Sequence, residues 1–166
     1  MAQAAVDNIT TANRARVRPS SVPWEIFDDP HGRPTTPVRI LLDTQQPGDP
    51  YVLQAKFPPG FEAGLHWHPF DTVYLITQGE MTIGDEGIFR VGDIRWVRAG
   101  HVYGPEQAGA EGVEFILVSL GGPIGLNWAD LEPVPEALTE RLAVSAERCG
   151  RVSSLVKAGP AVPVHV

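Results

Sequence analysis

The sequence predicts an all-β domain, a barrel or sandwich of short strands, followed by one helix. The 166 residues include 17 glycines and 16 prolines, which interrupt the chain at turn-sized intervals from residue 22 onward. Short runs rich in β-branched and aromatic residues lie between these breaks, as is typical of all-β sandwiches and barrels. A chain of this length is sufficient for one domain with its own hydrophobic core.

The elements follow in chain order. Residues 1–21 have low hydrophobicity, three arginines and no periodicity, which predicts a mobile N-terminal arm. Residues 22–132 are expected to form the barrel, with strands at VRILLD, YVLQAKF, TVYLIT, EMTI, IFRV, DIRWV and VEFILVSL. Residues 133–166 are expected to form a C-terminal helix and tail, because Pro135 and early acids precede late arginines over residues 133–152.

Composition narrows the class of function. The formal net charge is −7 and the basic residues are not clustered, which argues against nucleic acid or an anionic membrane as the main partner. The single cysteine, Cys149, excludes an internal disulfide and suits a reducing compartment. The apolar runs are too short to cross a bilayer, and the first residues lack a signal-peptide pattern. We therefore expect a cytoplasmic protein that handles a small molecule.

The most informative stretch is GLHWHPFDTVYLITQGEMTIG, residues 64–84. His66 and His68 stand one residue apart at the start of an alternating apolar run. A strand places such residues on one face, so both imidazoles are expected to point into the barrel with Thr72, Tyr74 and Ile76. Two neutral imidazoles on one face are suited to a divalent metal ion.

The glycine framework around the pair resembles the cupin superfamily. Gly60, His66, His68 and Gly79 reproduce the spacing of the first cupin motif, and Gly92-Asp93 with Gly100 resembles the second. The resemblance covers about residues 38–120 and implies a double-stranded β-helix, a small jelly-roll barrel with an internal metal pocket. Members of the family are mostly dimers, so it also implies a homodimer.

The sequence departs from the motifs at the other ligand positions. Thr72 stands where the family usually has a glutamate, Tyr103 where it has a histidine, and Arg98 where it has a proline. Three alternatives follow. His66, His68 and His101 form a three-histidine site; or Tyr103 acts as a ligand or acid–base group beside the metal; or the metal is lost and the histidines bind an organic ligand by hydrogen bonds.

The resemblance implies several possible activities, because cupins include dioxygenases, isomerases, cyclases, lyases and binders. The first expectation is an oxygen-dependent cupin dioxygenase acting on a small diketone, hydroxylated ketone or aromatic compound, with one divalent metal, Fe(II) before Ni(II) or Zn(II). Tyr103 and His101 would be its catalytic groups. The pocket wall is expected from the side chains of Thr72, Tyr74, Ile76, Phe115 and Leu117. The alternatives are a redox-neutral cyclase or isomerase of a polyketide-like substrate, or a non-catalytic small-molecule-binding cupin.

Three further expectations concern surfaces. Trp67 alternates away from the histidines and is expected on the outer face or at a dimer contact. Arg95 is either an inward group that holds a substrate carboxylate or, as charged strand residues usually are, a residue of the solvated face or of an interface. The edge strand VRILLD is expected to be covered in the dimer.

Overall fold

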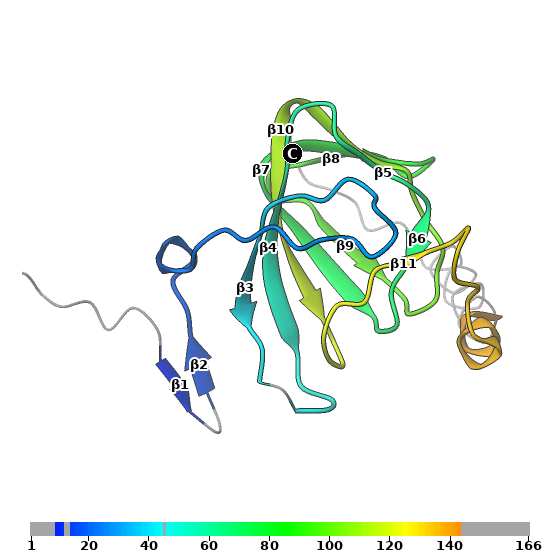
Figure 1. The fold of residues 1–166 in the computed structure, drawn as a ribbon, viewed down its shortest axis with the longest axis horizontal. Helices are drawn as coiled ribbons and strands as arrows, with labels where there is room; N and C mark the ends of the chain where they lie inside the picture. The colour runs from blue at the N-terminus through cyan, green and yellow to red at the C-terminus, as the bar shows by residue number, and fades with distance from the viewer. Residues whose placement is uncertain (1–8, 12–13, 45, 144–166) are drawn as a thin grey trace, which may run out of the picture.

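The computed structural model describes residues 9–11, 14–44 and 46–143, and its centre is a seven-stranded antiparallel sheet (Figure 1). The sheet runs in the order β3 (Val38–Leu42), β4 (Tyr51–Phe57), β10 (Glu106–Ser119), β7 (Thr72–Ile83) and β8 (Gly87–Arg90). Two short strands extend it: β5 (Glu62–Ala63) pairs with β10, and β9 (Ile94–Val97) pairs with β7. The all-β prediction is confirmed.

A second, small sheet supplies the histidines. It pairs β6 (His66–Trp67) with β11 (Asn127–Trp128). The expected strands are present but two are longer than predicted. TVYLIT and EMTI form one continuous strand, β7, and VEFILVSL is preceded by seven further residues of β10. These extra residues carry Glu106 into the barrel.

The barrel interior is filled from alternating strand positions, as a half-buried sheet requires. Apolar side chains from β4, β7 and β10 meet there, and the most deeply buried are Tyr74, Ile76, Met81, Ile83 and Phe115. Aromatic contacts join the layers: the ring of Phe115 lies edge-on to Phe57 at 5.1 Å and stacks on Tyr74 at 5.4 Å between centroids. Part of this core, Phe57, Tyr74 and Phe115, forms a wall of the cavity described below.

Before the barrel, the described residues of the expected arm include short regular elements. Strands β1 (Ile9–Thr11) and β2 (Arg14–Arg16) pair antiparallel, and a single 3₁₀ turn, η1 (Pro19–Ser21), follows. Figure 1 shows this hairpin standing away from the barrel. The expected boundaries at residues 21 and 132 stay predictions.

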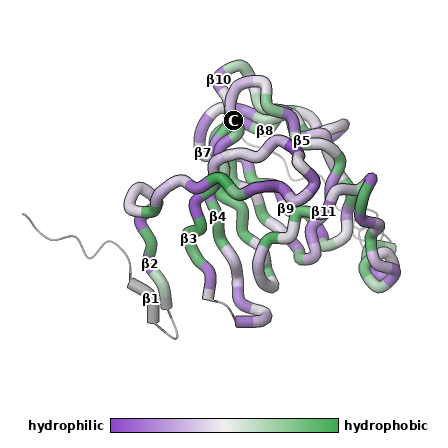
Figure 2. The backbone as a smooth tube through the Cα atoms, viewed as in Figure 1, coloured by the Kyte–Doolittle hydropathy of each residue, from purple (hydrophilic) through white to green (hydrophobic). Residues whose placement is uncertain are grey.

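Residues 27–37, which we call the strap, connect this region to β3 without regular strands. The strap is hydrophilic along most of its length (Figure 2). The Arg33 guanidinium donates two hydrogen bonds to the carboxylate of Asp130, at 2.8 and 2.7 Å. The indole N–H of Trp128 donates to Asp29 at 3.0 Å. These contacts fasten the strap to the chain at and just after β11.

A helix begins at residue 136 and runs to 143, the last described residue; the predicted remainder to 152 and the tail lie outside the described residues. The helix lies against the barrel, because Gly100 closely faces Leu138 and Arg141 is 3.3 Å from Asp71. The segment before it covers Trp67, which is buried and donates its indole N–H to the carbonyl of Glu132 at 2.8 Å. Trp67 does not line the cavity, and its expected place on the outer face or at a dimer contact stays a prediction. No helix among the described residues is long and apolar enough to cross a membrane.

Candidate active site

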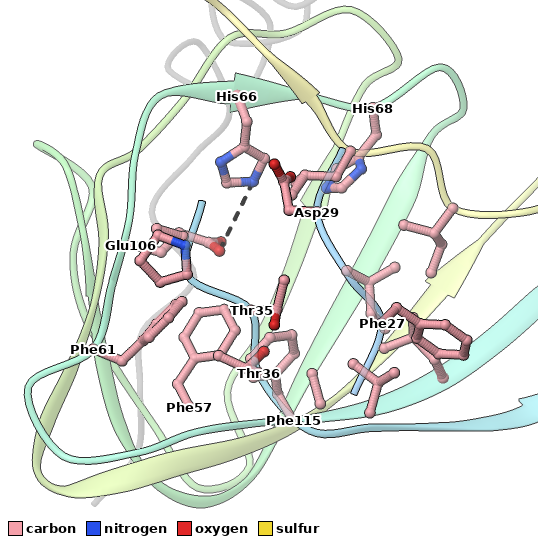
Figure 3. A pocket seen from close by; sticks show the side chains of 18 of the residues that line it. Phe27, Asp29, Thr35, Thr36, Phe57, Phe61, His66, His68, Glu106 and Phe115 are labelled. Carbon is pink, nitrogen blue, oxygen red and sulfur yellow. Dashed lines mark ion pairs between the residues drawn. The ribbon is translucent and has the colours of Figure 1, made fainter. Parts of the chain in front are cut away.

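A cavity of about 270 Å³ lies between the large sheet, the β6–β11 pair and the strap. Figure 3 shows His66, His68 and Glu106 on one side of it and three phenylalanines, Phe57, Phe61 and Phe115, on the other. The strap contributes part of the wall. The lining residues are Phe27, Asp29, Pro34, Thr35, Thr36, Val38, Leu53, Ala55, Phe57, Phe61, Ala63, His66, His68, Tyr74, Glu106, Phe115, Leu117, Ile124, Leu126 and Trp128.

The two histidines are held in fixed orientations by backbone carbonyls. The Nδ1–H of His66 donates to the oxygen of Gly64, and that of His68 donates to the oxygen of Gly125, both at 2.7 Å. A carbonyl only accepts, so each Nδ1 carries the proton and each Nε2 keeps a lone pair. Burial lowers the pKa of His66 to about 3 and that of His68 to about 4. Both imidazoles are therefore neutral near pH 7.

Glu106 was not among the predicted site residues. Its carboxyl group faces the imidazole of His66 within the cavity. Its Oε2 is 3.8 Å from Nε2 of His66, and its Oε1 is buried without a hydrogen-bond partner. Burial raises the pKa of Glu106 to about 7, while the charge of Arg95 and a hydrogen bond from Tyr74 act in the opposite direction. The result is a carboxyl group that can gain or lose a proton near neutral pH.

Two tyrosines connect the carboxyl group to His68. The hydroxyls of Tyr74 and Tyr103 share a short hydrogen bond, and the Tyr74 hydroxyl lies 3.4 Å from Nε2 of His68. Burial raises the pKa of each phenol well above its ordinary value, so both remain protonated. The hydroxyl pair can therefore donate a proton or a hydrogen bond towards the cavity.

Arg95 lies behind the tyrosines and does not line the cavity. Its guanidinium stacks over the ring of Tyr103, 4.1 Å from the centroid, and Nε donates to Glu86 at 2.7 Å. Only 5% of Arg95 is exposed, so the expectation of a solvated arginine is wrong. Arg95 is absent from the lining of the cavity, so it is not placed to hold a substrate carboxylate there.

The predicted site residues fall into three groups. Tyr74, Phe115 and Leu117 line the cavity with His66 and His68, as expected. Thr72, Ile76 and Tyr103 are buried but are not part of the lining, and the Thr72 hydroxyl has no hydrogen-bond partner. His101 is exposed, and only its ring face stacks near Tyr103, with 6.4 Å between centroids.

The metal expected from the sequence needs a third protein ligand besides the histidine pair. Across residues 9–11, 14–44 and 46–143, no three histidine, cysteine, aspartate or glutamate side chains are grouped so that they could hold a metal ion. The three-histidine set with His101 is therefore not formed. The Tyr103 hydroxyl is hydrogen-bonded to that of Tyr74, and its expected role as a ligand stays a prediction. The donor set that is present does not fit a conventional three-ligand site.

Sequence reasoning missed Glu106 for an identifiable reason. The residue follows Gly104-Pro105, which indicates a turn, yet it is the first residue of β10. Glu106 and Ala108 point inward at even positions, whereas Val113, Phe115 and Leu117 point inward at odd positions. The register shift between Ala108 and Val113 changes the parity. Alternation extrapolated from VEFILVSL therefore turns Glu106 outward.

The strap was missed as well. Its sequence, FDDPHGRPTTP, has no periodicity and only indicates a loop. Its contribution to the cavity depends on the contacts of Asp29 and Arg33 with a segment almost a hundred residues away. No local signal in the sequence encodes such a pairing.

Comparison with known proteins identifies the fold. No protein-family model and no curated protein matches the chain. Among solved structures, the polyketide cyclase RemF from Streptomyces resistomycificus is similar with a TM-score of 0.58 and 21% identity, over 75% of this chain and 92% of that one. A candidate acetylacetone dioxygenase from Methylibium petroleiphilum has a TM-score of 0.55 and 18% identity, over 81% and 91%.

A third similar structure is an RmlC-like cupin protein from Ralstonia eutropha, with a TM-score of 0.51 and 20% identity over 61% of this chain. The match spans 65% of the Ralstonia protein. At these identities the likeness concerns the fold, and proteins that share it differ in activity. The resemblance noted in the sequence is confirmed at this level: the chain has the cupin fold.

Proposed function

We propose that this protein is a redox-neutral enzyme that moves protons on a small, largely apolar carbonyl compound, as an isomerase or a cyclase does. The observation that carries the proposal is the position of Glu106: a buried carboxyl group, with Oε1 lacking a hydrogen-bond partner, that faces a neutral imidazole at one end of an aromatic cavity. A catalytic acid or base works best when its pKa lies near the working pH, and Glu106 meets this condition.

The other polar groups have complementary tasks. Glu106, when ionised, takes a proton from the carbon next to the substrate carbonyl. The Tyr74 hydroxyl, supported by its hydrogen bond with Tyr103, donates to the oxygen on which negative charge develops. Glu106 then returns the proton at a different carbon, or the enolate attacks a second carbonyl, closes a ring by a new C–C bond, and Glu106 returns the proton to the alkoxide that forms. Phe57, Phe61 and Phe115 exclude water from this end of the pocket.

The proposal is tested by hydrogen exchange at carbon. Acetophenones with ring hydroxyls are incubated in deuterated buffer under nitrogen with protein treated with a chelator, and deuterium in the methyl group is measured by mass spectrometry. We expect incorporation with the wild type and a loss of about a hundredfold or more in Glu106→Gln. Glu111→Gln, an exposed carboxylate on the same strand, is the control and should retain the rate. Equal rates in the two variants would refute the role of Glu106.

A second candidate is the oxygen-dependent reaction expected from the sequence. The fixed orientation of both imidazoles supports it, because metal-binding histidines usually donate their other ring N–H to a carbonyl. It needs metal that the histidine pair retains. Elemental analysis of the wild type and of His68→Ala, together with oxygen uptake on diketones and hydroxyacetophenones, tests it. Uptake that follows substrate and disappears in His68→Ala would favour this candidate over the first.

A further inference from the structure

The histidine end of the cavity contains more hydrogen-bond acceptors than donors. Nε2 of His66 and Nε2 of His68 both carry lone pairs, because each Nδ1–H is used by a backbone carbonyl. Oε1 of Glu106 is buried without a hydrogen-bond partner, and Oε2 lies 3.8 Å from Nε2 of His66. These atoms lie on side chains that line one side of the cavity (Figure 3).

Few protons are available to these acceptors from the protein itself. Of the two hydroxyl protons of Tyr74 and Tyr103, one is used in the bond between them. The other is left for His68, 3.4 Å from the Tyr74 hydroxyl, or for Glu106. The indole N–H of Trp128 is already donated to Asp29. Buried acceptors without donors are costly, so the occupant of this end must supply the missing hydrogens.

The charges around the cavity indicate that this occupant is neutral. No lysine or arginine is among the lining residues, so an anion has no counter-charge. A cation gains little as well: the Asp29 carboxylate in the lining already accepts from the indole N–H of Trp128 and the backbone N–H groups of His31 and Arg33. The guanidinium of Arg95 lies behind the tyrosines, 4.1 Å from the ring centre of Tyr103 and 5.5 Å from that of Tyr74. Hydroxyl groups donate hydrogen bonds without carrying charge.

We propose that the substrate of this site is a neutral hydroxylated aromatic compound that presents two hydroxyl donors to His66, His68 and Glu106. The inference rests on the proposed function and names its substrate class. The hydroxyls supply the missing hydrogens, and a carbonyl on the same compound accepts the free proton of the tyrosine pair. The aromatic ring packs against Phe57, Phe61 and Phe115. The cavity of about 270 Å³ has room for a compound of one or two rings.

The test compares ligands of similar shape that differ in their donors. Resorcinol, its dimethyl ether and benzylamine are titrated into chelator-treated protein at about pH 8, where Glu106 is mostly ionised. Resorcinol is chosen because its separated hydroxyls do not chelate a metal. Binding is followed through the indole N–H resonance of Trp128, identified by its loss in Trp128→Phe. We expect resorcinol to bind at least about tenfold more tightly than the ether, as two additional hydrogen bonds allow.

The matched variants are Glu106→Leu and Glu111→Leu. The preference for resorcinol should fall to about twofold in Glu106→Leu, which loses both carboxylate acceptors, and should persist in Glu111→Leu. If Glu106→Leu does not fold, Glu106→Gln replaces it; the preference should again fall, because the amide can itself donate to His66. Equal affinity for resorcinol and the ether, no binding of either, or tighter binding of benzylamine would overturn the inference.

The outcomes separate the inference from the proposed function. A preference for hydroxyl donors together with undiminished deuterium incorporation in Glu106→Gln would retain the substrate class and refute the proton-transfer role. Incorporation that requires Glu106 without a preference for resorcinol would retain the function and refute the substrate class.

Discussion

Glu106 shows how burial changes the chemistry of one side chain. The ordinary pKa of a glutamate, 4.5, rises to about 7 at this position. Between these two values the folded protein holds a proton that the unfolded chain has released. Stability must therefore fall as the pH rises through this interval, because the unfolded state binds fewer protons than the native state.

We predict that Glu106→Gln is more stable than the wild type at about pH 8 by roughly 1–3 kcal/mol, and that the difference disappears near the ordinary pKa of a carboxyl group. The glutamine stays neutral in the folded protein, whereas the wild type must bury a charge at high pH. Urea unfolding at a series of pH values measures this. Glu111→Gln should show no comparable dependence on pH. If the wild type were more stable than Glu106→Gln at about pH 8, another group of the folded protein would have to stabilise the ionised carboxylate of Glu106.

The sequence predicts that the side chains of His66 and His68 point inward. Side chains alternate between the two faces of a strand, and this alternation depends only on residues close together in the sequence. His66, His68, Tyr74, Phe115 and Leu117 follow from it and from the motif spacing. The position of Glu106 does not, because the irregular segment between Ala108 and Val113 lies between it and the periodic part of β10. His101 illustrates the opposite error, since its position next to a motif glycine does not direct its ring inward.

At the scale of the element, the backbones of β7 and β10 make a close crossing at two glycines. Gly79 of β7 has φ +69°, and a Cβ added there would lie 2.0 Å from the carbonyl oxygen of Gly112. Gly112 itself has φ +77° and lies within the irregular part of β10. Only glycine permits both the positive φ and this approach.

We predict that Gly79→Ala destabilises the protein by about 2–4 kcal/mol, because a methyl group would force the two strands apart. Gly48→Ala is the matched control: φ is +89° but nothing lies within 4 Å of its Cβ, so the change should cost only about 1 kcal/mol. Thermal and urea unfolding measure both. Equal losses would indicate that the backbone conformation alone, and not the crossing, determines the cost.

The sequence of the strap indicates only a loop. Its contacts with Trp128 and Asp130 give it a structural role that can be tested. The pair between Arg33 and Asp130 is partly exposed, so it should contribute only about 0–1 kcal/mol to stability. We predict that Arg33→Ala changes global stability little but increases cleavage within residues 27–37 in limited proteolysis. Arg90→Ala, which removes another exposed ion pair, should leave cleavage of the strap unchanged. Unaltered cleavage in Arg33→Ala would mean that other contacts suffice to hold the strap.

At the scale of the whole molecule, the outer face of the sheet carries exposed apolar side chains. Ile94 is 69% exposed and Trp96 51% exposed on β9, and they pair across the strands with Leu75 and Val73 of β7. β3, the predicted edge strand, is indeed at the end of the sheet order. Exposed apolar groups and a free edge are usually covered by another chain.

The homodimer expected from the sequence therefore stays a prediction that can be tested on this face. Light scattering should give twice the mass of one chain for the wild type, and Trp96→Glu should shift the population towards monomer at micromolar concentration. Arg90→Gln, on strand β8, changes the net charge by the same amount and controls for it. A wild type that is monomeric at every concentration tested would refute the prediction.

The fastening of the strap has a consequence for the order in which the molecule folds. Asp29 and Trp128 are separated by 99 positions, and Arg33 and Asp130 by 97. Closing so long a loop is entropically costly and is favourable only after the intervening strands have paired. We therefore expect the barrel to form first, while the cavity remains open to water. In stopped-flow refolding, the burial of the Trp128 indole should lag behind the formation of the β-sheet, and the last event of folding is the closure of the binding site.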